Sequence, residues 1–301
     1  MRIAFVGLGI MGAPVAGHLV RAGHPVTIAT RTNKPVVDEL AAAGARVADS
    51  LAAAALDADI VFTCLGTPAE VEQVYLGNGP GERSNSDNLA GAMATGTLAV
   101  DLTTSSPALA EAIAARLAER GVGFIDAPMT GGQGGAQKGT LTLLVGAHDA
   151  ELERARPVLA HFSSAIHHFG APGSGSRAKI ANQIAVASTL QGVAEALAFG
   201  VAGGLNAKAL VESLAAGTAD SFLMRIHGRK MVEGDMAPGF FIDHFVKDLR
   251  IALDEAAKLS LSLPGLTAAE RCHAALAAQG RGRDGIQAVI HALLADGLPA
   301  R

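Results

Sequence analysis

The chain carries little charge, and positive and negative residues nearly balance. Charged residues make up 17% of its 301 residues and the formal net charge is −4, whereas half of the chain is apolar. A disordered chain has few apolar residues and a high net charge, so disorder is excluded. The chain has no broad basic field, which argues against nucleic acid as a partner. Its length and apolar content predict two domains, each with its own core.

Cysteine is scarce and forms no recognisable motif. Cys64 and Cys272 stand in apolar surroundings without a CxxC pair or a nearby cluster. This usage favours two buried, unreactive thiols in a reducing compartment over a disulfide, so we expect a cytoplasmic protein. His167 and His168 end a strand-like run without an acidic or cysteine partner in register, so we expect no metal site.

Long uninterrupted hydrophobic runs are also missing. The closest candidate, residues 181–205, contains four polar residues: Asn182, Gln183, Gln191 and Glu195. We therefore expect a helix buried between domains, and neither a membrane-spanning helix nor a membrane partner. Residues 1–20 have the early arginine and apolar body of a signal peptide. Their regularly spaced glycines and the strand-like segment that follows favour a folded element instead.

The first half of the chain alternates strand and helix patterns. A short apolar run, 2–6, is followed by an amphipathic segment, 11–22, and by a second β-like run, 25–29. Further strand candidates span residues 60–65, 98–102, 123–126, 141–145 and 165–169, and helix candidates span residues 34–43, 69–75, 108–120 and 150–161. This alternation predicts an α/β fold with a doubly wound, mostly parallel sheet and right-handed crossovers.

The pattern changes at a cluster of turn residues, 170–175. Strand signals stop there and helical periodicity continues, which predicts an all-helical second half that begins with a long interdomain helix over about 176–203. The predicted domains are residues 1–172 and 173–301. The polar, glycine-rich stretch 77–88 is predicted to be a surface loop.

The first strand runs directly into a GxGxxG sequence. In this context the first glycine makes a tight turn, the second lets the backbone approach a pyrophosphate, and the third lets the helix pack on the strand. The N-terminus of the following helix presents free N–H groups and its positive dipole end to phosphates. The sequence therefore predicts a dinucleotide cofactor that is bound by Gly7, Leu8, Gly9, Ile10, Met11 and Gly12.

The type of dinucleotide is decided where the second strand ends. A carboxylate there accepts hydrogen bonds from the ribose of NAD and repels the 2′-phosphate of NADP. This chain has Arg31 and Thr32 instead, in the sequence TRTNK. The planar guanidinium of Arg31 suits a phosphate, and the neighbouring hydroxyl and amide can add hydrogen bonds. We predict NADP, with NAD as the alternative if Arg31 is only a solvated charge at the start of the next helix.

Taken together, the motifs of the chain resemble those of the β-hydroxyacid dehydrogenases, a family that includes 3-hydroxyisobutyrate dehydrogenase and tartronate semialdehyde reductase. The resemblance rests on five segments in the expected order: GLGIMGAPVAGHL (7–19), DLTTSSP (101–107), DAPMTGG (126–132), GAPGSGSRAKIANQ (170–183) and KDLRIALD (247–254). It implies a Rossmann domain followed by a helical domain for substrate binding and oligomerisation, in a homodimer or homotetramer. It also implies a short β-hydroxyacid or semialdehyde acid as the substrate.

Lys179 stands where the family has its catalytic lysine, and its chemistry fits that role. Hydride transfer to a carbonyl leaves an alkoxide that needs a proton. An ammonium group, with an ordinary pKa of about 10.4, enters the reductive direction already charged, whereas oxidation needs the neutral amine. We therefore expect aldehyde reduction to be efficient near neutral pH. Asn182, the second predicted catalytic residue, and Gln183 share a helix face with Lys179, and either amide can fix the lysine or bind a substrate oxygen.

Other segments are predicted to bind the substrate and the cofactor. Thr130, Gly131 and Gly132 offer a hydroxyl and unobstructed backbone N–H groups, which suit a small carboxylate, although the family usually has serine at position 130. The glycines that follow, up to residue 139, are expected to keep this loop flexible. Gln183 is a further candidate for substrate binding, and the resemblance implies cofactor contacts from Leu65, Thr104 and Lys247.

Three other functions stay open at this point. The first is NAD-dependent oxidation of 3-hydroxyisobutyrate, against which Arg31 and Gln183 both argue. The second is an NADPH-dependent imine reductase of the same architecture, and the third is a cofactor-binding module without catalysis. Lys179 argues against the last two, since imine reductases tend to have another residue there and non-catalytic relatives have lost the lysine. For Lys247, a simple ion pair with Asp248 is the alternative to a cofactor contact.

Overall fold

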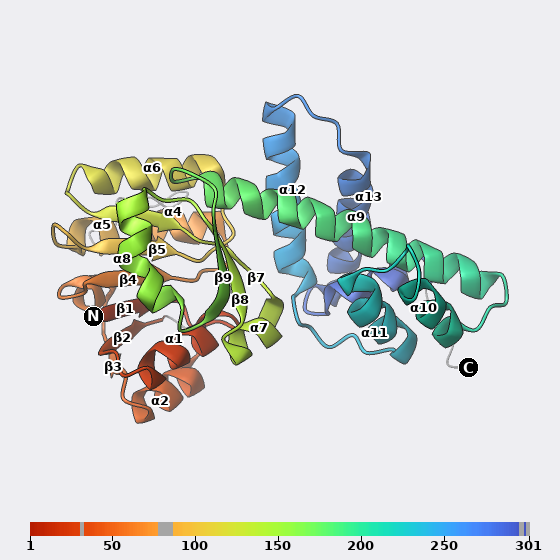
Figure 1. Cartoon of the computed structure of the whole chain (residues 1–301), viewed down its shortest axis with the longest axis horizontal. Helices are drawn as coiled ribbons and strands as arrows, with labels where there is room; N and C mark the ends of the chain where they lie inside the picture. Colours follow the sequence, from red (N-terminus) through yellow and green to blue (C-terminus); the bar gives the residue numbers. More distant parts are fainter. Residues whose placement is uncertain (31–32, 78–86, 295–297, 299–301) are drawn as a thin grey trace. The chain divides into compact units, whose positions relative to one another are not determined.

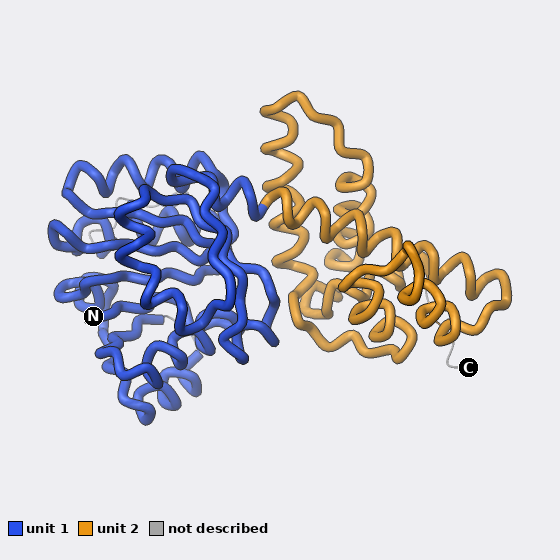
Figure 2. The backbone as a smooth tube through the Cα atoms, viewed as in Figure 1, with its two compact units in different colours: residues 1–179 blue, residues 180–301 orange. Residues whose placement is uncertain are grey.

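The computed structural model describes residues 1–30, 33–77, 87–294 and 298. The chain divides into two compact units, residues 1–179 and 180–301 (Figure 2). The long helix α9, Ser174–Ala202, begins in the first unit and continues into the second (Figure 1). The two units are described separately below.

The first unit is built on a six-stranded parallel sheet. Its strand order is β3-β2-β1-β4-β5-β6. The chain adds β2 and β3 on one side of β1, and then β4, β5 and β6 on the other side, so the order of addition reverses between β1 and β4. Such a reversal is the switch point at which doubly wound folds bind ligands, outside the carboxyl ends of the strands. The strands are β1 (Ile3–Val6), β2 (Val26–Ala29), β3 (Arg46–Val47), β4 (Ile60–Thr63), β5 (Leu98–Asp101) and β6 (Gly123–Asp126).

Helices cover both faces of this sheet, so its central strands β1, β4 and β5 are fully buried, whereas the short edge strand β3 is exposed. In β1, Ile3 and Phe5 pack into one apolar cluster, and Ala4 and Val6 pack into another on the opposite face. The first cluster includes side chains of α1 (Gly12–Arg21), α2 (Lys34–Ala42) and α8 (Asp149–Leu159). The second includes side chains of α3 (Leu51–Ala55), α4 (Pro68–Leu76), α5 (Leu89–Ala92) and α6 (Pro107–Ala118).

A second, three-stranded sheet follows the first, which the sequence patterns do not predict. It has the order β7-β8-β9, with β7 antiparallel to β8 and β8 parallel to β9. Its strands are β7 (Met129–Thr130), β8 (Leu141–Val145) and β9 (Ser163–His168). Asp126, the last residue of β6, forms an isolated bridge to Gly146 just after β8, which ties this sheet to the end of the first.

The glycine-rich segment after β7 is a helix, α7 (Gly132–Lys138), where the sequence predicts a flexible loop. Glycine costs about 1 kcal/mol relative to alanine at a helix position, so local preference does not explain α7. Tertiary contacts do: Ala136 is fully buried, and Nε2 of His18 on α1 lies 3.0 Å from the carbonyl oxygen of Ala136. The expectation of a flexible segment is therefore wrong.

The described part of the second unit is helical, apart from one isolated bridge between Phe241 and Gly285. Its core gathers side chains from α9 and from most of the helices that follow it. These are α10 (Ala207–Ala215), a π-helical segment (Met224–Gly228), α11 (Arg229–Glu233), α12 (Ile242–Lys258), α13 (Pro264–Leu276), a second π-helical segment (Ala277–Arg281) and a 3₁₀ segment (Ile286–Ala292). The predicted fold class, a doubly wound domain followed by a helical domain with a long helix between them, is confirmed.

Helix α9 contains most of the apolar stretch 181–205 noted in the sequence. Despite its polar residues, it is long and apolar enough by length and composition to cross a membrane, with a mean hydropathy of 1.5 over its most apolar window. Core helices pass the same test. Three of its side chains, Leu190, Ala194 and Leu197, are fully buried in the core of the second unit, as expected of a core helix.

Candidate active site

The GxGxxG turn lies between β1 and α1, at the switch point of the large sheet. Gly7 has φ +95°, and a Cβ there would overlap the carbonyl oxygen of Cys64, while a Cβ at Gly12 would overlap the carbonyl oxygen of Gly7. Around Gly9, in contrast, no atom lies within 4 Å of where a Cβ would stand. The first and third glycines therefore serve packing, and the second leaves open space beside the backbone.

This turn fits a pyrophosphate. Helix α1 starts at Gly12, its first turn contains no acidic residue, and the N-cap residue Met11 offers no side-chain hydrogen bond to the helix. The positive end of the α1 dipole is thus available to an anion that approaches over Gly9, whereas the N–H of Ala13 already donates to the carbonyl oxygen of Gly9 at 3.0 Å and Pro14 has no N–H. A bound nicotinamide dinucleotide would be held by this turn.

The residues predicted to select the nucleotide, Arg31 and Thr32, lie outside the described residues. The neighbouring Asn33 has a left-handed backbone, φ +72°, and its Nδ2 donates a hydrogen bond to the carbonyl oxygen of Leu8 at 2.6 Å. This amide therefore ties the start of α2, of which Asn33 is the N-cap residue, to the glycine turn. The sequence had indicated it only as a possible extra donor to a phosphate.

Two further cofactor candidates lie in the loops after neighbouring strands. Leu65 follows β4, Thr104 follows β5, and both are half-buried. The two loops are joined directly, because the backbone N–H of Leu65 donates to Oγ1 of Thr103 at 2.9 Å. The structure thus brings both loops to the same edge of the sheet.

A buried network beneath these loops was not found from the sequence. The hydroxyl of Thr63 donates to Oδ1 of Asp101 at 2.7 Å and lies 3.0 Å from the hydroxyl of Tyr75. Oδ1 of Asp101 also accepts from the backbone N–H of Thr103 at 3.1 Å. Burial raises the pKa of Asp101 to about 6, against the lowering effect of these hydrogen bonds. The signals in the sequence were the position of Asp101 at a strand end and its place as the first residue of the DLTTSSP segment.

Lys179 is buried, with 7% of its surface exposed, and its Nζ donates to the carbonyl oxygen of Met129 at 2.8 Å. Met129 directly precedes Thr130, the first residue of the predicted substrate loop. Gly131 and Gly132 have φ values of +124° and +61°, which favour glycine, and they lead from β7 into α7. The predicted proton donor and the predicted carboxylate loop are therefore neighbours within the first unit.

The other candidates form a polar cluster in the second unit. Nδ2 of Asn182 donates to Oε1 of Gln183 at 2.8 Å, and Nε2 of Gln183 donates to Oδ2 of Asp248 at 2.7 Å. Nζ of Lys247 pairs with Oδ1 of Asp248 at 2.8 Å. Asp248, which is 2% exposed, thus joins α9 to α12. The sequence showed it only as a possible partner of Lys247.

Two models of protein families match the chain in succession. The model of the NAD binding domain of 6-phosphogluconate dehydrogenase matches residues 2–170, and the NAD-binding model of NADP-dependent 3-hydroxyisobutyrate dehydrogenase matches residues 173–293. The chain belongs to the β-hydroxyacid dehydrogenase family. The resemblance seen in the sequence is thereby confirmed.

Individual relatives match over nearly the whole chain. The probable 3-hydroxyisobutyrate dehydrogenase-like 1, mitochondrial, of Arabidopsis thaliana is 37% identical over 97% of this chain and 85% of its own length. The 2-hydroxy-3-oxopropionate reductase of Escherichia coli is 34% identical over 97% of each chain. The solved 3-hydroxyisobutyrate dehydrogenase of Mycobacterium tuberculosis with L-serine is 33% identical, with a TM-score of 0.85 over 98% of this chain and all of that one.

As a β-hydroxyacid dehydrogenase, the protein is an NAD(P)-dependent oxidoreductase that acts on hydroxyacids or the corresponding carbonyl acids. The first unit provides the cofactor turn and the buried lysine. The second unit carries the Asn182–Gln183–Asp248–Lys247 cluster.

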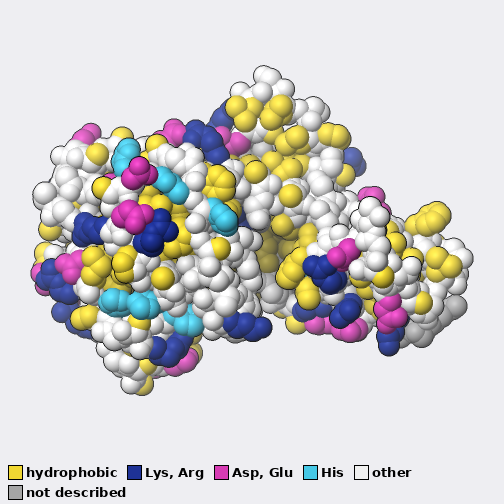
Figure 3. Space-filling view, viewed as in Figure 1, with side chains coloured by type: hydrophobic (Ala, Val, Ile, Leu, Met, Phe, Trp, Pro, Cys, Tyr) yellow, Lys and Arg dark blue, Asp and Glu magenta, His cyan; other side chains and the backbone are white. Residues whose placement is uncertain are grey.

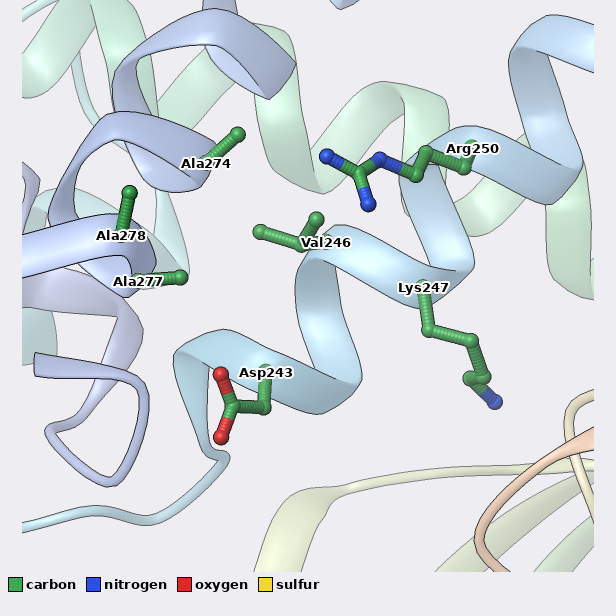
Figure 4. A pocket seen from close by; sticks show the side chains of 7 residues that line it. All are labelled: Asp243, Val246, Lys247, Arg250, Ala274, Ala277 and Ala278. Carbon is green, nitrogen blue, oxygen red and sulfur yellow. The ribbon is translucent and has the colours of Figure 1, made fainter. Parts of the chain in front are cut away.

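One hollow lies beside this cluster within the second unit. It has a volume of about 500 Å³ and is lined by Asp243, Val246, Lys247, Arg250, Ala274, Ala277 and Ala278 (Figure 4). Three of these residues are alanines, and Arg250 pairs with Glu270 at 2.9 Å. Lys247 is the one lining residue that the sequence predicted to have a role.

The cysteines and histidines noted in the sequence form neither a disulfide nor a metal site among the described residues. Neither Cys64 nor Cys272 forms a disulfide, and both are half-buried, so burial is less complete than expected. Nε2 of His168 lies 2.9 Å from the carbonyl oxygen of Ala147. Among the described residues, no group of three or more His, Cys, Asp or Glu side chains is arranged to hold a metal ion.

Proposed function

We propose that this protein is an NADP-dependent reductase of short semialdehyde acids, with tartronate semialdehyde or a close relative as substrate and Lys179 as the proton donor. The observation that carries the proposal is the position of Lys179. Its buried Nζ is held 2.8 Å from the carbonyl oxygen of Met129, next to the Thr130–Gly132 loop. A proton donor beside a carboxylate-binding loop suits a short substrate whose aldehyde and carboxylate are attached to the same carbon.

In such a reaction, different residues of the chain bind the substrate and transfer the proton. A bound NADPH supplies the hydride. Thr130, Gly131 and Gly132 bind the substrate carboxylate through a hydroxyl and backbone N–H groups and so orient the carbonyl. The ammonium of Lys179 polarises the carbonyl oxygen, stabilises the negative charge that develops there, and then transfers a proton to it. Asn182, one turn further along α9, fixes the position of the Lys179 side chain.

The choice of substrate also draws on the named relatives. The Escherichia coli relative is a 2-hydroxy-3-oxopropionate reductase, and this compound is tartronate semialdehyde. Gln183 supports the same choice, because the family resemblance places a second asparagine at this position in 3-hydroxyisobutyrate dehydrogenases. An alternative is NAD-dependent oxidation of 3-hydroxyisobutyrate. The names of other relatives favour this substrate.

A screen of steady-state rates tests the proposal. The substrates are glyoxylate and the tartronate, succinic and methylmalonate semialdehydes, each with NADPH and with NADH, and 3-hydroxyisobutyrate with NADP and NAD. We expect the highest kcat/KM for tartronate semialdehyde with NADPH. A higher value for oxidation of 3-hydroxyisobutyrate would support the alternative instead. Turnover of a cyclic imine alone would indicate an imine reductase, and NADPH binding without any turnover would indicate a non-catalytic module.

The preference for NADP rests on the sequence TRTNK, which has a guanidinium and no carboxylate between the end of β2 and α2. Replacement of Arg31 by Asp removes the phosphate partner and adds a repulsive charge. We expect the Kd of NADPH to rise by about 10- to 100-fold, as for the loss of a charged hydrogen bond, with little change for NADH. Equal changes for both nucleotides would place the selectivity elsewhere.

We also propose that the protein is a cytoplasmic homodimer or homotetramer. Among the described residues, seven of the eleven large exposed apolar side chains belong to the shorter second unit: Phe199, Leu205, Phe222, Ile226, Leu259, Leu261 and Leu293. Phe199 on α9 is 83% exposed, and Figure 3 shows hydrophobic side chains gathered over this part of the chain. Light scattering of the purified protein tests the assembly, and cell fractionation tests the location.

A further inference from the structure

The start of α9 is held by one buried carboxylate. Oδ1 of Asp126 accepts from the backbone N–H of Gly173 at 2.7 Å. Its Oδ2 accepts from the backbone N–H of Ser176 at 2.6 Å and from the hydroxyl of the same residue at 2.8 Å. Asp126 is 1% exposed, so these hydrogen bonds are shielded from water. A carboxylate in this position satisfies donors that a helix N-terminus otherwise leaves without partners.

The surrounding backbone is shaped around this residue. A Cβ at Gly146 would overlap Oδ1 of Asp126, and a Cβ at Gly175 would overlap its carbonyl oxygen. Asp126 and Gly146 also exchange both of their backbone hydrogen bonds, at 3.0 and 2.8 Å. The end of β6, the end of β8 and the first turn of α9 therefore meet at Asp126, and two glycines make room for it.

Lys179 lies one helical turn after Ser176. Its Nζ bonds to the carbonyl oxygen of Met129, which is three residues after Asp126. The short segment 126–129 thus contacts α9 twice, at the first turn through the carboxylate and at the lysine through a carbonyl. These two attachment points lie one helical turn apart on α9 and place Nζ next to the Thr130 loop.

We infer that Asp126 is a positioning residue, whose carboxylate anchors the first turn of α9 and so sets the place of the Lys179 ammonium. This inference rests on the proposed role of Lys179 as the proton donor. Burial raises the pKa of Asp126 to about 6, so the carboxyl group is ionised at neutral pH and accepts charge-assisted hydrogen bonds.

The test is a double-mutant cycle on kcat, with tartronate semialdehyde and NADPH. Asp126→Asn keeps the size of the side chain but replaces one acceptor oxygen by a donor. We expect kcat to fall by about 10- to 100-fold, as for a catalytic group misplaced by about 1 Å, while the Kd of NADPH stays within about twofold. In the Lys179→Ala background, Asp126→Asn should lower kcat no further, because its effect acts through the lysine.

Matched variants separate positioning from folding. Glu151→Gln changes another carboxylate at a helix start in the same unit: Glu151 on α8 accepts from the backbone N–H of the N-cap residue His148, and its substitution should leave kcat unchanged. Ser176→Ala removes only one of the three hydrogen bonds to Asp126 and should lower kcat by a few-fold. If Asp126→Asn does not fold, Ser176→Ala takes its place in the cycle.

The possible results separate the positioning role of Asp126 from the proposed function of Lys179. Losses in kcat that multiply in the double variant would show a general structural role and overturn the inference, as would a normal kcat for Asp126→Asn. Near-normal turnover by Lys179→Ala would overturn the proposed function and the inference together. A slow Lys179→Ala variant beside a fully active Asp126→Asn variant would overturn the positioning role alone.

Discussion

The two units present their candidate residues in different ways. In the first unit, the backbone shapes the candidate site. Gly7, Gly12, Gly131 and Gly132 allow close approaches or positive φ values after the ends of strands. In the second unit, side chains on two helices form a chain of hydrogen bonds from Asn182 to Lys247. Glycine spacing is visible in a sequence, whereas a network between distant helices is not. The first kind of site is therefore the easier one to predict.

The largest effect is expected at Lys179, a side chain on α9 that is held by a backbone carbonyl of the first unit. Lys179→Ala should lower kcat by about 10²- to 10⁴-fold, the range for a lost acid–base group, with NADPH still bound. Steady-state rates and NADPH fluorescence measure the two quantities. Turnover close to that of the parent enzyme would remove the lysine from the chemistry.

A pair of alanine substitutions tests whether the backbone determines the cofactor turn. Gly7→Ala forces a Cβ onto the carbonyl of Cys64 at a φ of +95°, so we expect a loss of about 3–5 kcal/mol in the free energy of unfolding. Gly9→Ala meets no neighbouring atom and should leave the thermal stability unchanged. It should still weaken NADPH binding by at least about tenfold, because the methyl group occupies the space of the pyrophosphate. Equal losses of stability in both variants would contradict this division.

Asp101 should make the stability of the first unit depend on pH. Its pKa in the folded protein, about 6, is above the ordinary value of 3.8, so folding binds a proton between these values. This contribution to stability is complete below about pH 4 and is lost as the pH rises through about 6, by about 3 kcal/mol.

Asp101→Asn keeps the oxygen that accepts from Thr63 and Thr103 but cannot ionise. The variant should match the parent near pH 4 and have a higher Tm at pH 7, in thermal scans at both values. A variant that is less stable at pH 7 would show that the charge itself is needed.

The smallest effect is expected in the polar cluster of the second unit. Gln183→Ala removes the donor to Oδ2 of Asp248 and the acceptor for Asn182, which should cost about 1–3 kcal/mol of unfolding free energy. Denaturant titration measures this loss, and KM for the aldehyde tests the predicted contact with substrate. A large rise in KM without any loss of stability would make Gln183 a substrate residue and not a link in the network.

Much of the first unit was predictable, because its signals are local. Buried parallel strands appear as short apolar runs and the glycine turn has fixed spacing, so the large sheet was predicted apart from its short edge strand β3. The short helices α3 and α5 and the strand β7 were missed, since two to five residues are too few to show a period. Helix α7 was missed because its glycines favour a loop and only its packing makes it helical.

The sequence by itself determined the fold class, the family, the cofactor turn and the identity of the catalytic candidate, Lys179. These follow from local spacing and from motifs that lie within short stretches of chain. Only the tertiary structure showed what holds the candidates in place: Asp101 beneath the loops after β4 and β5, Asp126 of β6 bonded to the start of α9, and Asp248 of α12 bonded to α9. Each is a buried carboxylate, and a buried charge persists only where distant parts of the chain supply its hydrogen-bond partners. Such partners are far apart in sequence, so they become known only once the chain is folded.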